Sequence, residues 1–476
     1  MATSCGRSPR TRWKSRHGAT WPWAWSPPRP SGTRCSKLAP KAQPQTTPPR
    51  QPLPREALAG RRASALQSVP PARTQRSRSR PPPPASQTAP TKRQPRQRPH
   101  QVRQGDRTLW AGQEALRSCG ARAVELRYRA ISRRKLLGEN HMEYRNFGHT
   151  DLSCSAVGFG TWEMGTTQYG EIDIRQAVRA VEMAVDHGIT LFDTAEVYGP
   201  FTSEELLARG LGARRKDVVL VTKVGFAYRD DPDASGPAAV AGRDASPAHI
   251  TEHTEGCLER LGTDYLDLLL IHWPDHKTPH EDTIAALEAM KEAGKIRHYG
   301  VSNYDVPMMA ECERHGHLTA NQVGYHMFDR RMEAAVLPYC QAQGIGYMAY
   351  GSLGFGLLTG AFTPDTTFVD WDWRSSGRAF GLPLFEREHF LKELKVVERL
   401  REFAADSGHS VAQLAIAWLL GNRAVTVGLV GMRNETELEE NVAAADWRLS
   451  DADRATIDGF FAAEGVPTYV DAKQAA

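Results

Sequence analysis

Eight short apolar segments, separated by longer amphipathic stretches, constrain the fold of this chain more than any other feature. The apolar segments are residues 156–160, 190–194, 218–224, 266–273, 298–303, 321–326, 346–352 and 426–431. The amphipathic stretches include 247–261 and 174–187, in which Val178, Val181 and Val185 fall on one stripe at helical spacing. This alternation predicts eight β-α units.

The apolar segments are of the kind found in parallel sheets. The run Leu-Leu-Leu-Ile at 268–271 is continuously apolar, as in parallel strands covered on both faces. Eight β-α units predict a (β/α)8 TIM barrel, and residues 144–148 and 152–157 predict a β-hairpin that closes its bottom. A doubly wound dinucleotide-binding fold is excluded, because 158–163 reads Gly-Phe-Gly-Thr-Trp-Glu and lacks the Gly-x-Gly-x-x-Gly turn.

Charge and proline content divide the chain at residue 142. Residues 1–141 hold 30 Lys+Arg, 5 Asp+Glu and 20 of the 31 prolines, whereas 142–476 hold 30 Lys+Arg and 50 Asp+Glu. The overall charge of +5 therefore describes neither part and does not indicate a nucleic-acid-binding barrel. Because its apolar residues are sparse and aperiodic, we expect 1–141 to be a disordered basic segment.

Three interpretations of residues 1–141 remain open. A basic tail can bind nucleic acid through phosphate contacts, and the Arg/Ser bias resembles a transit peptide, although the prolines oppose an amphipathic helix. In the third, translation starts at Met142, where patterned sequence begins and where the preceding Gly138-Glu139 can be encoded by a purine-rich ribosome-binding sequence. We expect the third, with 142–476 forming the barrel domain. N-terminal sequencing of natively expressed protein tests this hypothesis.

Cysteine usage and hydropathy indicate a protein of the reducing cytoplasm. No apolar run approaches the ~18 residues of a membrane-spanning helix, and no secretory signal is present. The cysteines form no Cys-x-x-Cys pair and no Cys/His cluster at metal-ligand spacing, so neither disulfides nor a metal site are expected. They are Cys5, Cys35, Cys119, Cys154, Cys257, Cys312 and Cys340.

Polar residues end three successive expected strands. These are Asp193, Lys223 and His272, with Tyr198 five residues beyond the first. The C-terminal strand ends of a barrel carry its catalytic groups, so these four side chains are expected to converge. Each residue alone has a structural explanation, as a helix cap, a strand-end charge or a core histidine, but the ordered set favours an active site.

The four side chains suit proton donation to a carbonyl oxygen. A tyrosine hydroxyl with its ordinary pKa of about 10 is a poor donor near neutrality. We expect Lys223 to lower the pKa of Tyr198 by stabilising the phenolate, and Asp193 to keep the lysine charged and oriented. His272 can hydrogen-bond a substrate carbonyl and polarise it.

The stretch at 188–199, Gly-Ile-Thr-Leu-Phe-Asp-Thr-Ala-Glu-Val-Tyr-Gly, resembles the signature of the aldo-keto reductase family. Leu-Ile-His-Trp-Pro at 270–274 and Gly-Val-Ser-Asn at 300–303 fit the family too, and the resemblance covers residues 142 to about 462. It implies a barrel that binds NADPH in extended form and transfers hydride to an aldehyde or ketone. The resemblance makes Tyr198 the proton donor.

The resemblance also implies a set of cofactor contacts. Ser302, Asn303 and Gln322 match the positions that hold the nicotinamide carboxamide, and Tyr350 matches the aromatic that stacks on the ring, although a core tyrosine is the alternative. The loop 351–360 matches the pyrophosphate loop, where small residues let backbone N–H groups approach phosphate. Within it the expected contacts are Gly351, Ser352, Leu353 and Gly356.

The adenosine end is implied by residues after the last strand. Arg433 is expected to pair with a 2′-phosphate, Asn434 to support it, and Glu440 and Asn441 to line the adenosine site. Glu437 stands where Gln or Arg is common in the family, and a carboxylate there disfavours a 2′-phosphate. Because Arg433 is placed to pair with a 2′-phosphate, NADPH is still the expected cofactor, and NADH is left open.

The substrate is identified only as a small carbonyl compound. Aromatic residues on the loops after strands 1, 3 and 4 can form an apolar mouth or can simply pack: Trp162, Tyr169, Phe226, Tyr228 and Trp273. The insert 361–385 resembles the loop that folds over the cofactor in bacterial family members, and its Arg374 is placed to touch the pyrophosphate.

An alternative function is a cofactor-sensing regulatory barrel with little turnover, like the channel-associated β-subunits that share the fold and the four site residues. We expect the barrel itself to bind neither membrane nor nucleic acid. Substrate identity, working direction and oligomeric state stay open.

Overall fold

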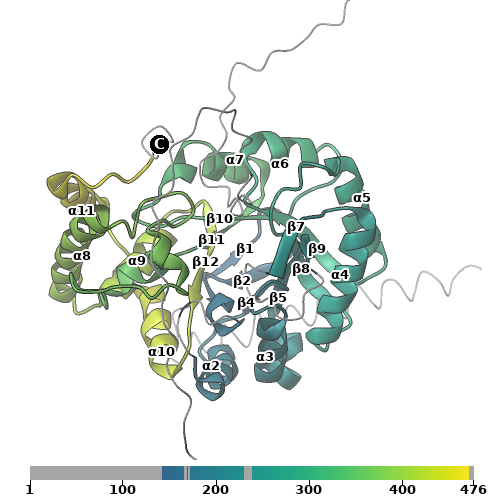
Figure 1. The fold of residues 1–476 in the computed structure, drawn as a ribbon, viewed down its shortest axis with the longest axis horizontal. Coiled ribbons are helices and arrows are strands. Elements are labelled where there is room, and N and C mark those ends of the chain that lie inside the picture. Colours follow the sequence, from purple (N-terminus) through teal and green to yellow (C-terminus); the bar gives the residue numbers. More distant parts are fainter. Residues whose placement is uncertain (1–141, 166–168, 170–171, 230–238, 471–476) are drawn as a thin grey trace, which may run out of the picture. The chain divides into compact units, whose positions relative to one another are not determined.

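The computed structural model describes residues 142–165, 169, 172–229 and 239–470. Eight parallel strands form a closed barrel (Figure 1), and β12 closes it by pairing with β3. In their order around the barrel the strands are β3 (Val157–Gly160), β4 (Leu191–Asp193), β5 (Val219–Val224), β8 (Leu266–Ile271), β9 (Ile296–Ser302), β10 (Ala320–Gly324), β11 (Gly346–Tyr350) and β12 (Val425–Gly431). The predicted barrel is confirmed, and each of its strands coincides with one of the expected apolar segments.

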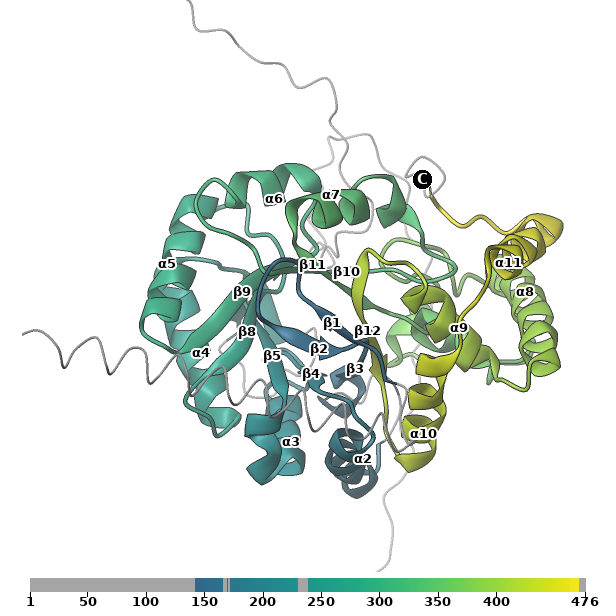
Figure 2. The same cartoon turned by 180° about the vertical axis from the view of Figure 1, so that it is seen from behind.

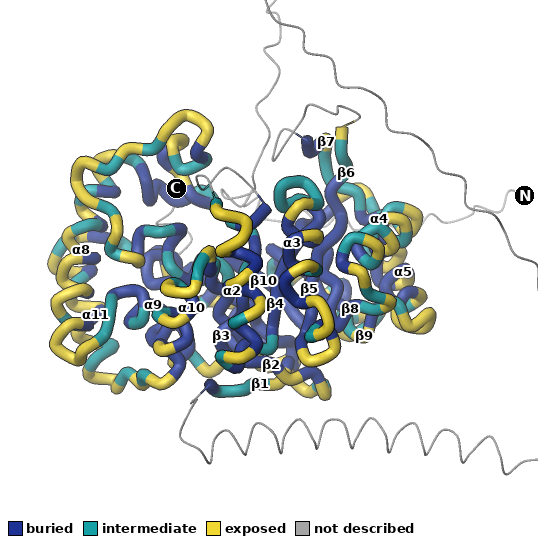
Figure 3. Tube along the Cα trace, turned by 90° about the horizontal axis from the view of Figure 1, so that it is seen from below, coloured by how far each residue is buried: buried dark blue, intermediate teal, exposed yellow. Residues whose placement is uncertain are grey.

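The strands are buried on both faces, which explains their continuous apolar runs. Every residue of β5 and β8 is buried. At Gly300 in β9 a Cβ atom would lie 2.3 Å from the carbonyl oxygen of Ala320 in β10, so these two strands can approach as they do only with glycine there. Figure 3 shows the buried strands inside a layer of helices whose outer faces are exposed.

Helices follow the strands and surround the barrel (Figures 1 and 2). The predicted helices at 174–187 and 247–261 are α2 and α4. The described helices are α2 (Ile174–Asp186), α3 (Thr202–Leu211), α4 (Pro247–Arg260), α5 (His280–Glu292), α6 (Val306–Cys312), α7 (Val336–Gln343), α8 (Arg387–Asp406), α9 (Val411–Leu420), α10 (Glu435–Ala443) and α11 (Asp451–Glu464). The Asp173 side chain caps α2 by accepting hydrogen bonds from the backbone N–H groups of Arg175 and Gln176.

The N-terminal hairpin covers one end of the barrel, as predicted. Strands β1 (Tyr144–Asn146) and β2 (Ser153–Ser155) are antiparallel and lie across the barrel in Figure 2. Phe147, between them, is fully buried in the core inside the barrel, together with Leu191 and Val219 near the N-terminal ends of β4 and β5. The hairpin thus closes the bottom and leaves the C-terminal strand ends open.

Two features on the opposite side were not predicted as elements. A second antiparallel hairpin, β6 (Phe226–Tyr228) with β7 (Val240–Arg243), lies between β5 and α4. The insert 361–385 contains a 3₁₀ turn at Trp373–Ser376 and packs Phe380 against the ring of Phe355 at a centroid distance of 5.2 Å.

Some expectations concern residues that the structure does not describe. The basic, proline-rich segment 1–141 lies outside the described residues. Among those described, no helix has the length and apolar content needed to cross a membrane, and Cys154, Cys257, Cys312 and Cys340 are buried free thiols.

Candidate active site

The three strand-end residues continue the inward-facing positions of their strands. Side chains alternate between the two faces of a strand, and the residues two positions before Asp193, Lys223 and His272 belong to the core inside the barrel. Those residues are Leu191, Val221 and Leu270. The alternation therefore directs all three polar side chains toward the barrel axis, at its open end.

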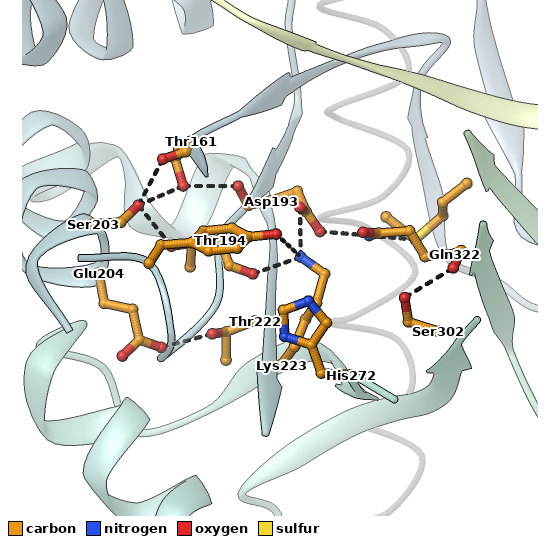
Figure 4. Close-up of polar contacts among 12 residues, drawn as sticks. Thr161, Asp193, Thr194, Ser203, Glu204, Thr222, Lys223, His272, Ser302 and Gln322 are labelled. Atoms are coloured by element: carbon orange, nitrogen blue, oxygen red, sulfur yellow. Dashed lines mark hydrogen bonds and ion pairs between the residues drawn. The ribbon is translucent and has the colours of Figure 1, made fainter. Parts of the chain in front are cut away.

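A buried ion pair forms the centre of the site (Figure 4). Lys223 is fully buried, and its Nζ donates to Asp193 Oδ1 at 2.6 Å, to the Thr194 carbonyl oxygen at 2.8 Å and to the Tyr198 hydroxyl at 3.3 Å. Gln322 Nε2 donates to the other carboxylate oxygen of Asp193 at 2.7 Å. The structure thus brings Asp193, Lys223 and Tyr198 together and adds Gln322 as a fourth member of one hydrogen-bonded chain.

Burial dominates the electrostatics of this chain. Loss of water raises the pKa of Asp193 and lowers the pKa of Lys223, while the ion pair between them opposes both shifts. Burial also raises the pKa of Tyr198 well above its ordinary value of 10.0, and the charge of Asp193 adds to the rise. The expectation that Lys223 lowers the pKa of Tyr198 is therefore wrong, because the contact at 3.3 Å does not outweigh burial. Tyr198 remains a protonated phenol.

His272 lies beside Tyr198 as a neutral ring. The ring centroids are 5.9 Å apart in an edge-on arrangement, and the Phe226 ring also packs on His272, with its centroid 5.0 Å away. Burial lowers the pKa of His272 well below its ordinary value of 6.5, and the positive charges of Lys223 and Arg243 add to the shift. A neutral imidazole can donate one hydrogen bond, as a carbonyl oxygen requires.

Two glycines fix the backbone that carries Tyr198. A Cβ on Gly165 would lie 2.3 Å from the Tyr198 carbonyl oxygen, and a Cβ on Gly199, which has a φ of +85°, would lie 1.6 Å from the Gly165 carbonyl oxygen. Behind this contact Ser203 Oγ donates to Thr161 Oγ1 at 2.7 Å (Figure 4). The loops after β3 and β4 are locked together at the position of Tyr198.

A cavity of about 910 Å³ opens onto the site. Asp193, Tyr198 and His272 line it, with Lys223 buried beneath. The predicted cofactor contacts that line the same cavity are Ser302, Asn303, Gln322, Tyr350, Gly351, Ser352, Leu353, Gly356, Arg433, Glu440 and Asn441. Asn434 does not line it. Its side chain caps α10 by accepting from the backbone N–H of Glu437.

The predicted carboxamide-binding residues already bond to the site. Asn303, with a left-handed φ of +64°, donates from Nδ2 to the His272 carbonyl oxygen at 3.1 Å and accepts from the Tyr350 hydroxyl at 2.9 Å. Ser302 Oγ donates to the Gln322 carbonyl oxygen at 2.8 Å. These side chains link the ends of β8, β9, β10 and β11 in one hydrogen-bonded network.

Arg433 is paired within the protein. Its Nη2 donates to Glu437 Oε1 at 2.7 Å, and its backbone N–H donates to Glu437 Oε2 at 2.8 Å. The hydrogen bond to Glu437 raises the pKa of Arg433, so the guanidinium remains charged. A phosphate that binds Arg433 must therefore compete with the carboxylate of Glu437, the residue that departs from the family pattern.

The insert 361–385 contributes to the cavity wall. Arg374 donates to both carboxylate oxygens of Asp372 and, at 3.2 Å, to the carbonyl oxygen of Phe355 in the predicted pyrophosphate loop. Trp373 stacks on Trp162 with a centroid distance of 5.8 Å. The insert is therefore bonded to the loop 351–360 and packed against the loop after β3; that it closes over a bound cofactor stays a prediction.

The family model for the aldo/keto reductase family matches residues 156–461. The chain belongs to the aldo/keto reductase family. Membership makes it an oxidoreductase of the NAD(P)H-dependent type. The match spans all eight barrel strands and every residue of the candidate site.

Curated relatives cover the same part of the chain. The aldo-keto reductase YhdN of Bacillus subtilis is 35% identical over 320 residues, 67% of this chain and 93% of the relative. The NADH-specific methylglyoxal reductase of Escherichia coli is 33% identical over 314 residues, 64% and 94% of the two chains. A probable voltage-gated potassium channel subunit beta of Arabidopsis thaliana is 32% identical over 321 residues, 64% and 92% of the two chains.

Solved structures of family members have the same fold. The glycerol dehydrogenase of Gluconobacter oxydans superposes with a TM-score of 0.62 at 33% identity, covering 68% of this chain and 96% of that one. An aldo/keto reductase of Klebsiella pneumoniae, solved in complex with NADP and acetate, gives a TM-score of 0.51 at 29% identity, covering 67% and 95%.

The aromatic residues predicted to form the mouth divide into two groups. Trp162, Tyr169, Phe226 and Trp273 line the cavity of this family member. Tyr228 does not. It lies behind the site, with its ring stacked on His253 at 5.8 Å.

Sequence reasoning missed several residues of the site. Phe380 lines the cavity, and its ring centroid is 5.2 Å from that of Tyr350. Glu163, next to the predicted aromatic Trp162, also lines the cavity. Glu204 is a buried carboxylate that accepts from Thr222 at 2.6 Å (Figure 4). The conspicuous aromatics of the insert were a usable signal for Phe380, whereas nothing local marks Glu204, whose partner is on another element.

Proposed function

We propose that the protein reduces an aldehyde or ketone to an alcohol by hydride transfer from NADPH, with Tyr198 as the general acid. The observation that carries this proposal is the contact of the Tyr198 hydroxyl with the buried Lys223–Asp193 ion pair, beside a neutral His272 and at one end of a large cavity. Among the described residues that line the cavity, Tyr198 is the tyrosine whose hydroxyl accepts a hydrogen bond from a buried lysine.

The residues around the cavity suit an extended dinucleotide. Buried amides at Asn303 and Gln322 can both donate and accept, as a carboxamide requires. Gly356, with a φ of +102°, lies in a loop of left-handed and turn conformations that brings backbone close to the cavity. Arg433 supplies a positive charge at the end of β12. The cofactor, when bound, supplies the hydride.

The chain's own residues handle the proton. His272, neutral because of burial, donates a hydrogen bond that orients the carbonyl oxygen and increases its polarity. Tyr198 then gives its proton to that oxygen. The phenolate left behind faces Lys223 Nζ, which stabilises it only after the proton has gone, and Asp193 holds the lysine in place. The aromatic wall of Trp162, Phe226 and Trp273 keeps water from the reacting atoms.

The decisive test is NADPH oxidation by purified protein with a panel of aldehydes and ketones, comparing wild type with Tyr198→Phe. We expect the substitution to lower kcat by roughly 10²–10⁴-fold, the range of general acid catalysis, while NADPH still binds. Tyr347→Phe is the matched control, because this buried tyrosine does not line the cavity. Equal rates for wild type and Tyr198→Phe would contradict the proposal.

A second function is favoured by the similarity to a probable potassium channel β-subunit. In that case the barrel binds the cofactor and reports its oxidation state to a partner protein, with very slow turnover. Tight NADPH binding without turnover on any carbonyl compound of the panel would support this function over the first.

A further inference from the structure

A cluster of two histidines and a carboxylate lies behind the loop that carries Tyr198. Glu196 is on that loop, and His249 and His253 are on α4, one helical turn apart. One candidate ligand atom from each of the three side chains lies within 4.8 Å of the other two. None of the three lines the cavity of the active site.

Glu196 is incompletely satisfied by the protein. It is fully buried, and its Oε2 accepts from His253 Nδ1 at 2.6 Å. Its Oε1 is buried without a hydrogen-bond partner among the described residues, and so is the hydroxyl of the neighbouring Tyr228. A buried carboxylate oxygen without a partner is costly, and its position beside two imidazoles is where a cation would relieve that cost.

His249 Nε2 is hydrogen-bonded to the Phe226 carbonyl oxygen at 3.1 Å, which leaves its Nδ1 as the candidate ligand atom. The rings of His249 and His253 stack on each other. Their centroids are 3.8 Å apart and the rings are nearly parallel, as the i, i+4 spacing on a helix allows. The side chain of His249 is 12% exposed and that of His253 is 20% exposed. Both imidazoles are therefore partly open to solvent, whereas the carboxylate between them and the Tyr198 loop is buried.

We propose that Glu196, His249 and His253 bind one divalent transition-metal ion, with Zn²⁺ the best chemical match. Two imidazoles and one carboxylate are a set of three protein ligands that Zn²⁺ accepts, with water completing four-coordination. The ion takes the place of the hydrogen bond between Glu196 and His253, and Tyr228 is placed to hydrogen-bond within the site. Because Glu196 is two residues from Tyr198, the ion stabilises the loop that carries the catalytic tyrosine.

The sequence contains the signal for this site, although it was not used. The spacing His-x-x-x-His at 249–253 lies on a predicted helix, but two histidines without a third ligand nearby in the sequence do not by themselves indicate a metal site. The third ligand comes from a segment more than 50 residues away, and only the barrel brings it beside α4.

The test is Zn²⁺ binding by the full chain, prepared without a histidine tag, stripped with EDTA and titrated by calorimetry. We expect the wild type to bind a zinc ion that His249→Asn and His253→Asn each lose, with affinity falling by at least about 100-fold. His249→Asn is the sharper variant, because it leaves the hydrogen bond between Glu196 and His253 intact. Co²⁺ in place of Zn²⁺ should give visible absorption that the same variants lose.

Matched controls separate this site from others and from misfolding. His317→Asn removes an exposed histidine that also pairs with a glutamate and should retain zinc binding. Tyr198→Phe should bind zinc like the wild type, so failure of the proposed reductase function would not affect this result. Zinc should raise the unfolding midpoint of the wild type but not of His249→Asn. Wild-type binding equal to that of His249→Asn, or no saturable binding, would overturn the proposal.

Discussion

At the residue scale, the buried ion pair between Lys223 and Asp193 determines when the site stabilises charge. With Tyr198 protonated, Lys223 is satisfied by Asp193 and by the Thr194 carbonyl oxygen. The third contact, to the Tyr198 hydroxyl at 3.3 Å, becomes strong only when the phenolate forms. Stabilisation is therefore reserved for the stage at which the proton leaves, which is the condition for a gain in kcat.

The two shifted pKa values predict how reduction depends on pH. The raised pKa of Tyr198 keeps the acid protonated beyond its ordinary value of 10.0, and the lowered pKa of His272 keeps the ring neutral below 6.5. Both required forms therefore coexist across the whole interval. We expect kcat/KM for carbonyl reduction to be level between roughly pH 6.5 and 10, measured at saturating cofactor. A bell-shaped profile with a limb near pH 8 would show that the pKa assignments are wrong.

Glu437 is predicted to control the choice of cofactor. Glu437 already pairs with the Arg433 guanidinium. A 2′-phosphate must therefore displace the Glu437 carboxylate and then lies beside its negative charge, whereas a free ribose hydroxyl need not displace it. Glu437→Gln should therefore strengthen NADPH binding by roughly fivefold, the scale of one partly exposed charge pair, and change NADH binding little. Glu439→Gln, at an exposed residue of the same helix that does not line the cavity, is the control. Dissociation constants from fluorescence titration decide between these outcomes.

At the element scale, glycine contacts bring the loops after β3 and β4 close together beside Tyr198. Gly199 combines a φ of +85° with a Cβ position 1.6 Å from the Gly165 carbonyl oxygen, so alanine there must displace the backbone next to Tyr198. We expect Gly199→Ala to lower kcat at least about tenfold and to destabilise the fold by more than the ~1–2 kcal/mol that a left-handed alanine costs by itself.

Gly212 supplies the matched control for this prediction. It also has a positive φ, of +45°, but a Cβ there meets nothing within 4 Å. Gly212→Ala should therefore show the cost of the backbone conformation alone in chemical unfolding and leave kcat unchanged. If both variants lose activity equally, the close approach of the two loops is not what positions Tyr198.

Elements were predictable where periodicity is strong and local. Runs such as Leu268–Ile271 indicate buried strands irrespective of their neighbours, and the alternation along each strand places Asp193 and Lys223 on the inward face. The hairpin of β6 and β7 and the position of Phe380 were not predictable in the same way, because long-range packing rather than local pattern determines them. The pairing of Arg433 with Glu437 was only partly predictable from the sequence. The i, i+4 spacing was visible, but its use as an internal ion pair depends on the turn after β12.

At the scale of the whole molecule, the barrel and its site are contained in the part of the chain that the structure describes from Met142 onward. All eight barrel strands and every described residue lining the cavity lie within 157–441. The abrupt change in charge and proline content at residue 142 predicts that 142–476 forms the barrel domain, since a packed core requires apolar periodicity that the first part lacks; this division stays a prediction.

The first described residues are anchored in the barrel, which leads to a prediction about truncation. Met142 is buried, and Glu143 accepts hydrogen bonds from Arg145, Arg423 and Arg448. A chain of residues 142–476 should therefore retain the unfolding midpoint and the kcat of the full chain. A chain beginning at 148 should not, because it loses β1 and the Phe147 ring that fills the bottom of the barrel. Thermal unfolding and reductase assays of the two truncated chains test both statements. We propose that 142–476 is the folding unit. Equal losses of unfolding midpoint and kcat in both truncated chains would instead mean that residues before 142 contribute to the fold.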